Sequence, residues 1–131
     1  MATILVIDDD DLVRQTLQAV LAAAGHRVAM APNGRLGVDK LGQDRFDLVI
    51  TDILMPEQEG LETIREIRRR DRSIGILVIS GGDRDTGTDF FSAALTFGAD
   101  AALAKPFTRQ EILDGIQAVL LKRQERTAGK E

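Results

Sequence analysis

Short apolar runs alternate with longer amphipathic stretches five times along the chain, and this alternation predicts the fold. The runs occupy residues 4–7, 28–30, 48–50, 76–79 and 101–104. Because polar residues do not alternate with apolar ones inside these runs, each run is typical of a strand that is buried on both faces, as in a parallel sheet.

The stretches between the runs have the spacing of amphipathic helices. In the first stretch Val13, Leu17 and Leu21 recur at every fourth residue, and Gly25 follows where a helix can end. The last stretch opens with a capping-box sequence at 108–111 and continues with apolar residues at helical spacing. Five strand–helix units in this order predict right-handed crossovers and a doubly wound α/β fold.

The predicted units end near residue 121. A chain of 131 residues has the size of one domain. Residues 122–131 are polar and are typical of a frayed helix end or the start of a linker. We therefore expect one domain over residues 1–121 and a short polar tail.

Composition excludes several classes of function. The absence of cysteine excludes disulfides, thiol nucleophiles and thiolate metal sites, and a single histidine excludes histidine-cluster metal sites. The net charge of −4 and aromatic residues that are all phenylalanine do not favour a nucleic-acid surface. No apolar run approaches the roughly 20 residues of a membrane span. We expect a cytoplasmic domain that binds neither nucleic acid nor membrane.

Polar residues with chemical potential stand directly after four of the predicted strands. Asp8 and Asp9 follow the first, Asp52 the third, Ser80 the fourth and Lys105 the fifth. Because the carboxyl ends of parallel strands meet along one edge of a sheet, where ligands bind, we expect these side chains to converge on one pocket. An isolated aspartate after a strand is more often a cap or turn residue, and it is the coincidence at four strand ends that favours a pocket.

The chemistry of this pocket follows from its charges. Three carboxylates repel each other unless a cation lies among them, and oxygen ligands favour Mg²⁺ or Mn²⁺. A hard cation, a lysine and a hydroxyl group together bind the oxygens of a phosphoryl group. Asp52 stands alone after a middle strand, so it is the best candidate for a nucleophile that forms an aspartyl phosphate.

These residues, in this order, resemble the receiver domains of two-component response regulators over residues 2–121. The matching positions are Asp8-Asp9, Asp52 with Met55-Pro56 and Gly60, Ser80, and Lys105-Pro106-Phe107. The resemblance implies a flavodoxin-like fold, in which five parallel strands in the order 2-1-3-4-5 are covered by five helices. It also implies a single-domain, chemotaxis-type regulator or an isolated receiver.

The resemblance further implies a phosphorelay function. Asp52 is expected to accept a phosphoryl group from a sensor histidine kinase or a histidine phosphotransfer protein. Asp9 and Asp52 are expected to ligate Mg²⁺ directly, Asp8 through water, and Leu54 through its backbone carbonyl. Such a domain is a signalling switch and not an enzyme, although it assists its own phosphorylation and dephosphorylation.

The resemblance assigns the switch as well. Lys105 is expected to bind a phosphoryl oxygen, with a cis peptide bond before Pro106, and Ser80 to move toward the phosphoryl group. This movement would bias the face of the fourth helix, fifth strand and fifth helix toward a downstream protein. The family usually carries Tyr or Phe where this chain has Ala102, so the aromatic half of the usual switch is missing.

Two other functions stay open. A Mg²⁺-dependent phosphohydrolase of the haloacid-dehalogenase type also uses an aspartate nucleophile after a strand, and residues 8–10 offer its D-x-D pattern. Leu12, however, stands where that family has Thr or Val, and the chain is short for that fold. The other alternative is a receiver-like binding module that is never phosphorylated.

Three groups outside the pocket have structural interpretations. His26 follows Gly25 in a predicted turn and is expected to be exposed. The arginines at 68–70 are expected to be a solvated helix end, where cations interact favourably with the helix dipole.

The remaining group contains phenylalanines of the predicted fourth helix. Phe91 and Leu95 are expected to face the sheet. Phe90 and Phe97 fall at one edge of that arc, where core packing and an exposed partner surface remain equal alternatives.

Overall fold

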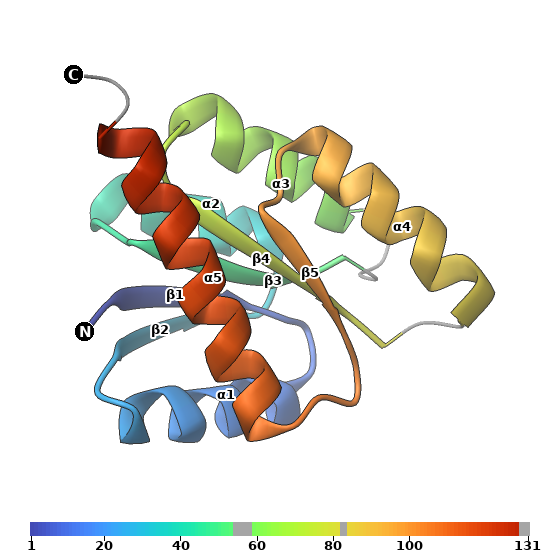
Figure 1. Cartoon of the computed structure of the whole chain (residues 1–131), viewed down its shortest axis with the longest axis horizontal. Coiled ribbons are helices and arrows are strands. Elements are labelled where there is room, and N and C mark those ends of the chain that lie inside the picture. The colour runs from blue at the N-terminus through green and yellow to red at the C-terminus, as the bar shows by residue number, and fades with distance from the viewer. Residues whose placement is uncertain (54–58, 82–83, 129–131) are drawn as a thin grey trace.

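The computed structural model (Figure 1) describes residues 1–53, 59–81 and 84–128, and in these ranges strands and helices alternate. The elements are β1 (Thr3–Ile7), α1 (Asp11–Ala23), β2 (Arg27–Ala31), α2 (Gly34–Gln43), β3 (Leu48–Asp52), α3 (Glu59–Arg70), β4 (Gly75–Ser80), α4 (Arg84–Phe97), β5 (Ala101–Ala104) and α5 (Arg109–Ala128). The strands form one parallel sheet in the order β2-β1-β3-β4-β5. The predicted fold and strand order are confirmed.

Helices cover both faces of the sheet, with α1 and α5 on one face and α2, α3 and α4 on the other (Figure 1). Each face has its own apolar cluster. Along β1, Ile4 and Val6 belong to the cluster under α1 and α5, whereas Leu5 and Ile7 belong to the other. The expected burial on both faces holds for β3 and β4, where every residue is buried. The edge strands β2 and β5 are mostly only partly buried, because each has a neighbouring strand on one side alone.

Local sequence signals fix where the helices begin. The side chain of Asp10 caps α1 by accepting from the backbone N–H of Leu12 at 2.9 Å. The predicted capping box begins α5, where Thr108 N–H donates to Glu111 Oε1 at 2.9 Å and Glu111 N–H donates to Thr108 Oγ1 at 3.0 Å. Both motifs satisfy backbone donors that a helix leaves without partners.

Helix α5 continues through the segment that we expected to be a frayed end. Lys122 donates to the backbone oxygen of Asp100 at 2.7 Å, and Arg126 donates to its carboxylate at 2.6 Å. Arg123 forms an ion pair of 3.5 Å with Asp47. The polar side chains of this segment therefore hold α5 against the loops at the amino-terminal edge of the sheet, while the domain boundary at residue 121 stays a prediction.

Arg68 corrects the expectation of a solvated helix end at 68–70. Its guanidinium donates to the backbone oxygens of Gly98 at 2.8 Å and Ile74 at 2.7 Å, and to the Asp100 carboxylate at 3.3 Å. Arg69 and Arg70 are exposed, as expected. A single position of the basic run thus serves as a structural donor to orphan carbonyl groups.

Two further expectations are wrong in detail. His26 is half-buried, and its Nδ1 accepts a hydrogen bond of 3.0 Å from the backbone N–H of Ala2. Leu95 is 49% exposed, whereas Phe91 packs against the apolar cluster under α4, as expected. Phe97 is exposed, and the side chain of Phe90 lies outside the described part of the structure. In the same described ranges, no helix is long and apolar enough to cross a membrane.

Candidate functional site

The polar residues predicted at the strand ends lie at one edge of the sheet. Asp8 follows β1, Asp52 ends β3 and Ser80 ends β4, and all three are buried. Asp9 is exposed beside them, and Lys105 follows β5. The parallel register brings together side chains that are as many as 97 positions apart in the sequence.

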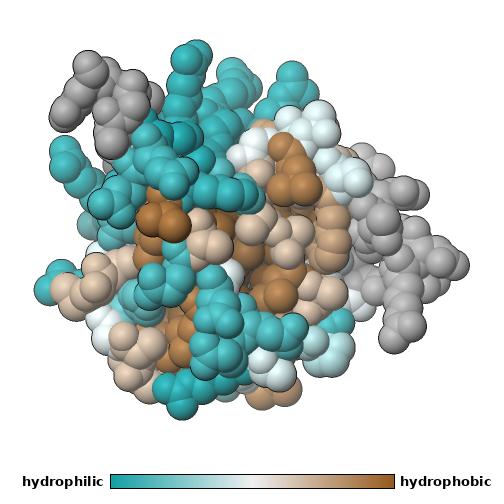
Figure 2. All heavy atoms as spheres, viewed as in Figure 1, coloured by the Kyte–Doolittle hydropathy of each residue, from teal (hydrophilic) through white to brown (hydrophobic). Residues whose placement is uncertain are grey.

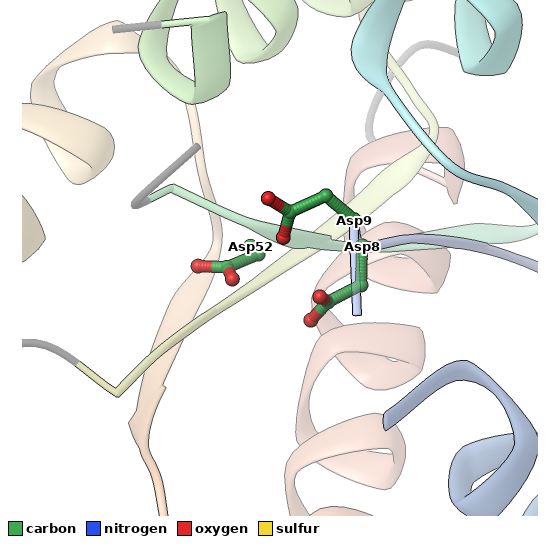
Figure 3. Close-up of side chains that lie close together, drawn as sticks. All are labelled: Asp8, Asp9 and Asp52. Carbon is green, nitrogen blue, oxygen red and sulfur yellow. The ribbon is translucent and has the colours of Figure 1, made fainter. Parts of the chain in front are cut away.

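Three carboxylates form the centre of the site (Figure 3). One oxygen from each of Asp8, Asp9 and Asp52 lies within 4.8 Å of the others. Ligand oxygens on an octahedral Mg²⁺ lie at most about 4.2 Å apart, since each is about 2.1 Å from the ion. Small side-chain adjustments therefore close this set around one cation, and the oxygen-only donors fit Mg²⁺.

Lys105 links two of the carboxylates. Its Nζ donates to Oδ2 of Asp8 and to Oδ2 of Asp52, at 3.1 Å in both cases. The backbone positions the lysine, because its N–H donates to the Ser80 oxygen at 2.8 Å. The peptide bond between Lys105 and Pro106 is cis. The expected cis bond is confirmed. One ammonium group thus partly neutralises the buried pair of acids.

The surroundings alter the pKa of both charged partners in this contact. Burial raises the pKa of Asp8, and this effect outweighs the N–H of Asp10 and the ammonium of Lys105, which lower it. Burial by itself lowers the pKa of Lys105, but the charges of Asp52 and Asp8 outweigh that effect and raise it. The lysine therefore stays protonated at neutral pH, so the site holds a cation where a phosphoryl group would bring negative charge.

Backbone contacts fix the orientation of Asp8. Its Oδ1 accepts from the N–H of Asp10 at 2.9 Å, and its own N–H donates to Ala31 at 3.2 Å. Arg14 Nη1 donates to the backbone oxygen of Asp8 at 2.6 Å, and Arg14 Nη2 pairs with Asp11. Oδ2 of Asp8 is thereby directed toward Lys105 and Asp52.

Gly60 allows α3 to begin against the backbone that follows Asp52. A Cβ at this position would lie 2.4 Å from the Cα of Ile53 and 2.5 Å from its oxygen. Real Cβ atoms do not approach a backbone so closely, so only glycine fits. This contact explains why a glycine accompanies the Asp52 motif.

Some predicted positions remain outside this description. Leu54 and the Met55-Pro56 pair lie outside the described residues. Ala102 is half-buried on β5, opposite Val78 of β4, and packs against the same apolar cluster as Phe91. Its small side chain leaves β5 without an aromatic ring at this place.

Sequence reasoning missed an apolar groove beside the site. The groove has a volume of about 490 Å³ and is lined by Leu12, Val13, Thr16, Leu17, Gly81, Lys105, Pro106 and Phe107. Leu12 is 70% exposed, although it lies in the first turn of α1, next to the acidic cluster. The available signal was that Leu12 lies outside the apolar stripe of Val13, Leu17 and Leu21, which faces the core.

Comparison with known proteins places this geometry in a family. The family model described as the response regulator receiver domain matches residues 4–117. Response regulator MprA from Mycolicibacterium vanbaalenii is 39% identical over 117 residues, which are 89% of this chain and 49% of that protein. MprA from Mycobacterium avium is 38% identical over 117 residues, which are 89% of this chain and 50% of that protein. The chain therefore spans about half the length of these relatives.

Solved structures agree with the sequence relatives. Chemotaxis protein CheY4 from Vibrio cholerae is 30% identical, with a TM-score of 0.81 over 91% of this chain and 98% of that chain. A CheY-like response regulator receiver domain protein from Methanospirillum hungatei has a TM-score of 0.86 and 24% identity over 96% of this chain and 98% of that chain. The second likeness concerns the fold alone.

Proposed function

The chain belongs to the family of response regulator receiver domains, and from this premise we propose that Asp52 is the residue that accepts the phosphoryl group. Receiver domains of this family are signalling domains that are phosphorylated on an aspartate. The observation that carries the assignment is the pair of 3.1 Å contacts between Lys105 and the carboxylates of Asp8 and Asp52. Asp52 ends the middle strand, so its carboxylate lies between the proposed metal ligands and the proposed phosphoryl ligands.

The proposed reaction is a displacement at phosphorus. A carboxylate oxygen of Asp52 forms a bond to phosphorus while the phosphorus–nitrogen bond of a phosphohistidine breaks. The electron pair of the broken bond leaves with the imidazole nitrogen of the donor. Lys105 then binds a phosphoryl oxygen, and Ser80, which is buried at the end of β4, moves to donate a hydrogen bond to another.

We assign Asp8, Asp9 and Asp52 to a Mg²⁺ site, together with the backbone carbonyl of Leu54 as in related domains. Asp9 and Asp52 would be direct ligands, and Asp8 would act through water. When bound, the ion supplies positive charge that offsets the charge of the phosphoryl oxygens. The exposed position of Asp9 leaves this side of the cluster open to solvent, from which an ion can enter.

Asp10 argues against the phosphohydrolase alternative. In the D-x-D pattern of that class, both acids act in the pocket, and the second of them would be Asp10. Here the carboxylate of Asp10 accepts from the N–H groups of Leu12 and Val13, at 2.9 and 3.4 Å. It therefore caps α1 and is directed away from Asp52.

The apolar groove beside Lys105 is the surface that we assign to the phosphoryl donor. A donor histidine must approach Asp52 from the open edge of the sheet, and this groove borders that edge. Leu12 and Phe107 offer apolar contact area close to the reacting group. The proposed donor is a sensor histidine kinase or a histidine phosphotransfer protein.

A different face is proposed for the downstream protein. Apolar side chains gather between α5 and α4, over β5, on the side shown in Figure 2. The first three residues of β5 are partly buried and the last, Ala104, is exposed, so this strand is not fully covered. We propose that phosphorylation changes this face through Ser80 of β4, which pairs with Ala104 of the neighbouring strand β5.

Incubation with acetyl phosphate and Mg²⁺, followed by intact-protein mass spectrometry, tests the assignment. We expect a single phosphoryl addition that is lost in Asp52→Asn and retained in Asp39→Asn, an exposed aspartate of α2. An addition that persists in Asp52→Asn would place the acceptor elsewhere. No addition to the wild type, with acetyl phosphate and with phosphorylated kinases alike, would favour the binding-module alternative.

A further inference from the structure

A second charged feature lies on α3, at the opposite edge of the sheet from Asp52. Three of its members recur at i, i+3 and i+4 and so share one face of the helix, and the fourth follows in the bend after Arg70, the last residue of α3. This basic stripe consists of Arg65, Arg68, Arg69 and Arg72. The neighbouring face of α3 holds Ile64 and Ile67, which are fully buried, so the exposed arginines of the stripe, unlike Arg68, are not needed to attach the helix to the core.

The basic stripe lines a cleft together with one aromatic residue. The cleft has a volume of about 590 Å³, and Phe97, at the end of α4, forms its other side. Phe97 is 38% exposed. Guanidinium groups beside an accessible apolar ring can bind anionic groups and an apolar group at the same time.

Arg68 forms the fixed base of this cleft. Its nitrogens donate to the backbone oxygens of Gly98, Ile74 and Arg72, at 2.8, 2.7 and 2.9 Å. These bonds hold the end of α3 against the end of α4, so the distance between the stripe and Phe97 is set by the fold. A cleft that is formed before binding does not have to be ordered by its ligand.

The other three arginines of the stripe are available to a ligand. Arg65 and Arg72 form no ion pair with any residue that the structure describes. Arg69 contacts Glu66 only at 3.4 Å, with its side chain 74% exposed, and Glu66 forms a shorter pair of 3.0 Å with Arg70. Exposed pairs of this kind contribute little and are readily exchanged.

We propose that this cleft binds an acidic segment of a partner protein, with carboxylates on the three available arginines and an apolar side chain on Phe97. Guanidinium groups pair with carboxylates through two parallel hydrogen bonds. Arg65 and Arg69 lie one turn apart on α3, and Arg72 follows in the bend after the helix, where it lines the same cleft. A partner helix with acids at i, i+4 and i+7 spreads three carboxylates over about 10 Å and can present one to each arginine.

The charge around the basic stripe favours a short acidic segment over a nucleic acid. Nucleic acids are bound through many phosphates along a continuous basic track. Here Glu62, Glu66 and Asp71 flank the stripe, and the whole chain carries a net charge of −4. The proposal concerns a site at the edge opposite Asp52 and does not depend on phosphorylation.

Fluorescence anisotropy tests this proposal. The probe is a labelled helical peptide with glutamates at i, i+4 and i+7 and one leucine, and the reference is the same peptide with glutamines at those positions. We expect saturable binding of the glutamate peptide that weakens as salt rises from about 50 to about 150 mM. Binding of the glutamine peptide should be at least about tenfold weaker.

Matched variants separate the cleft from a general effect of charge. Arg65→Gln, Arg69→Gln and Arg72→Gln, combined in one protein, should weaken peptide binding about tenfold. The control combines Arg27→Gln, Arg35→Gln and Arg109→Gln, which remove the same charge from exposed positions elsewhere, and should retain binding. Phe97→Ala should weaken binding of the leucine peptide more than that of a version with alanine. Circular dichroism confirms that each variant is folded.

Three results would overturn the proposal. They are equal losses in the two triple variants, the absence of saturable binding, and tighter binding of a single-stranded DNA oligonucleotide or inorganic phosphate than of the peptide. Asp52→Asn should bind the peptide as the wild type does. A failure of this test therefore leaves the assignment of Asp52 intact, and a failure of acetyl phosphate labelling leaves this one intact.

Discussion

The ammonium nitrogen of Lys105 lies 3.1 Å from Oδ2 of Asp52, and it lies equally close to Oδ2 of Asp8. The Lys105 side chain is 20% exposed, whereas that of Asp8 is fully buried. The lysine therefore offsets repulsion that the buried acids would otherwise experience. A cation bound by the same acids offsets the same repulsion, so Lys105 and a bound metal stabilise the fold in overlapping ways.

This overlap predicts the behaviour of Lys105→Met. Without divalent metal, the free energy of unfolding should fall by about 2 kcal/mol, because two carboxylates lose their shared partner. Mg²⁺ should stabilise the variant more than the wild type, since no ammonium group competes with the ion. Acetyl phosphate labelling should become slower. Urea denaturation followed by circular dichroism, with Mg²⁺ and with a chelator, measures the first two effects.

Lys40→Met is the control for that experiment, because the same change is then made on α2, away from the acids. It should leave the effect of Mg²⁺ as in the wild type. If Lys105→Met responded to Mg²⁺ no more strongly than Lys40→Met does, the acids would not be the metal site.

Gly60 gives a second prediction, which connects packing with the site. Gly60→Ala should lower the free energy of unfolding by about 2 kcal/mol, because its Cβ would overlap the backbone of Ile53. The strain should also displace the residues next to Asp52 and slow labelling by acetyl phosphate. Gly42→Ala is the matched control, since nothing lies within 4 Å of its Cβ, and it should stabilise α2 by about 0.5 kcal/mol. Equal effects of the two changes would contradict this account.

The fold and the centre of the site could be predicted from the sequence because both depend on short-range patterns. Buried parallel strands appear as uninterrupted apolar runs. The polar residues that directly follow these strands lie at one edge of the sheet, whatever the conformation of the connecting loops. Asp8, Asp52 and Lys105 were therefore predicted to meet. The distances were not predictable, and neither was the lysine's position between two acids, because that depends on how β5 pairs with β4.

Positions whose environment is set by distant segments were predicted less well. Arg68 looked like its neighbours in the basic run, but its partners Gly98 and Asp100 are 30 and 32 residues away. His26 is half-buried because the amino terminus passes beside it. Leu95 is exposed because the apolar arc of α4 is wider than the area that the sheet covers, and helical spacing does not show which edge of such an arc is buried.

Asp100 supports a third prediction, at the edge of the sheet opposite Asp52. Its carboxylate accepts from the N–H of Ile76 at 2.9 Å and from Arg126 at 2.6 Å, and it also pairs with Arg68. Asp100→Asn should lower the free energy of unfolding by about 2–4 kcal/mol, because a neutral amide leaves two partly buried arginines without a counter-charge. Urea denaturation measures the loss.

The control for Asp100 is an aspartate of α5 that makes a single exposed contact. Asp114 accepts from Gln110 at 2.7 Å, and Asp114→Asn should change stability by no more than about 0.5 kcal/mol. If Asp100→Asn also lowered the free energy of unfolding by no more than about 0.5 kcal/mol, the contacts of Asp100 with Arg68 and Arg126 would not hold α5 in place.

His26 predicts a pH dependence that is separate from the phosphorylation site. Burial lowers the pKa of His26 from its ordinary 6.5, and the nearby amino-terminal charge acts in the same direction. Below 6.5 the unfolded chain therefore binds more protons at this residue than the folded protein does, so the contribution of His26 to stability is present above that pH and is lost as the pH falls through the lowered pKa. His26→Asn keeps an acceptor for the Ala2 N–H without titrating. From about pH 7.5 to about pH 5.5, the free energy of unfolding should fall more in the wild type than in His26→Asn. Urea denaturation at each pH measures it. If the free energies of the two proteins changed with pH in parallel, the pKa of His26 would be the same in the folded and the unfolded state.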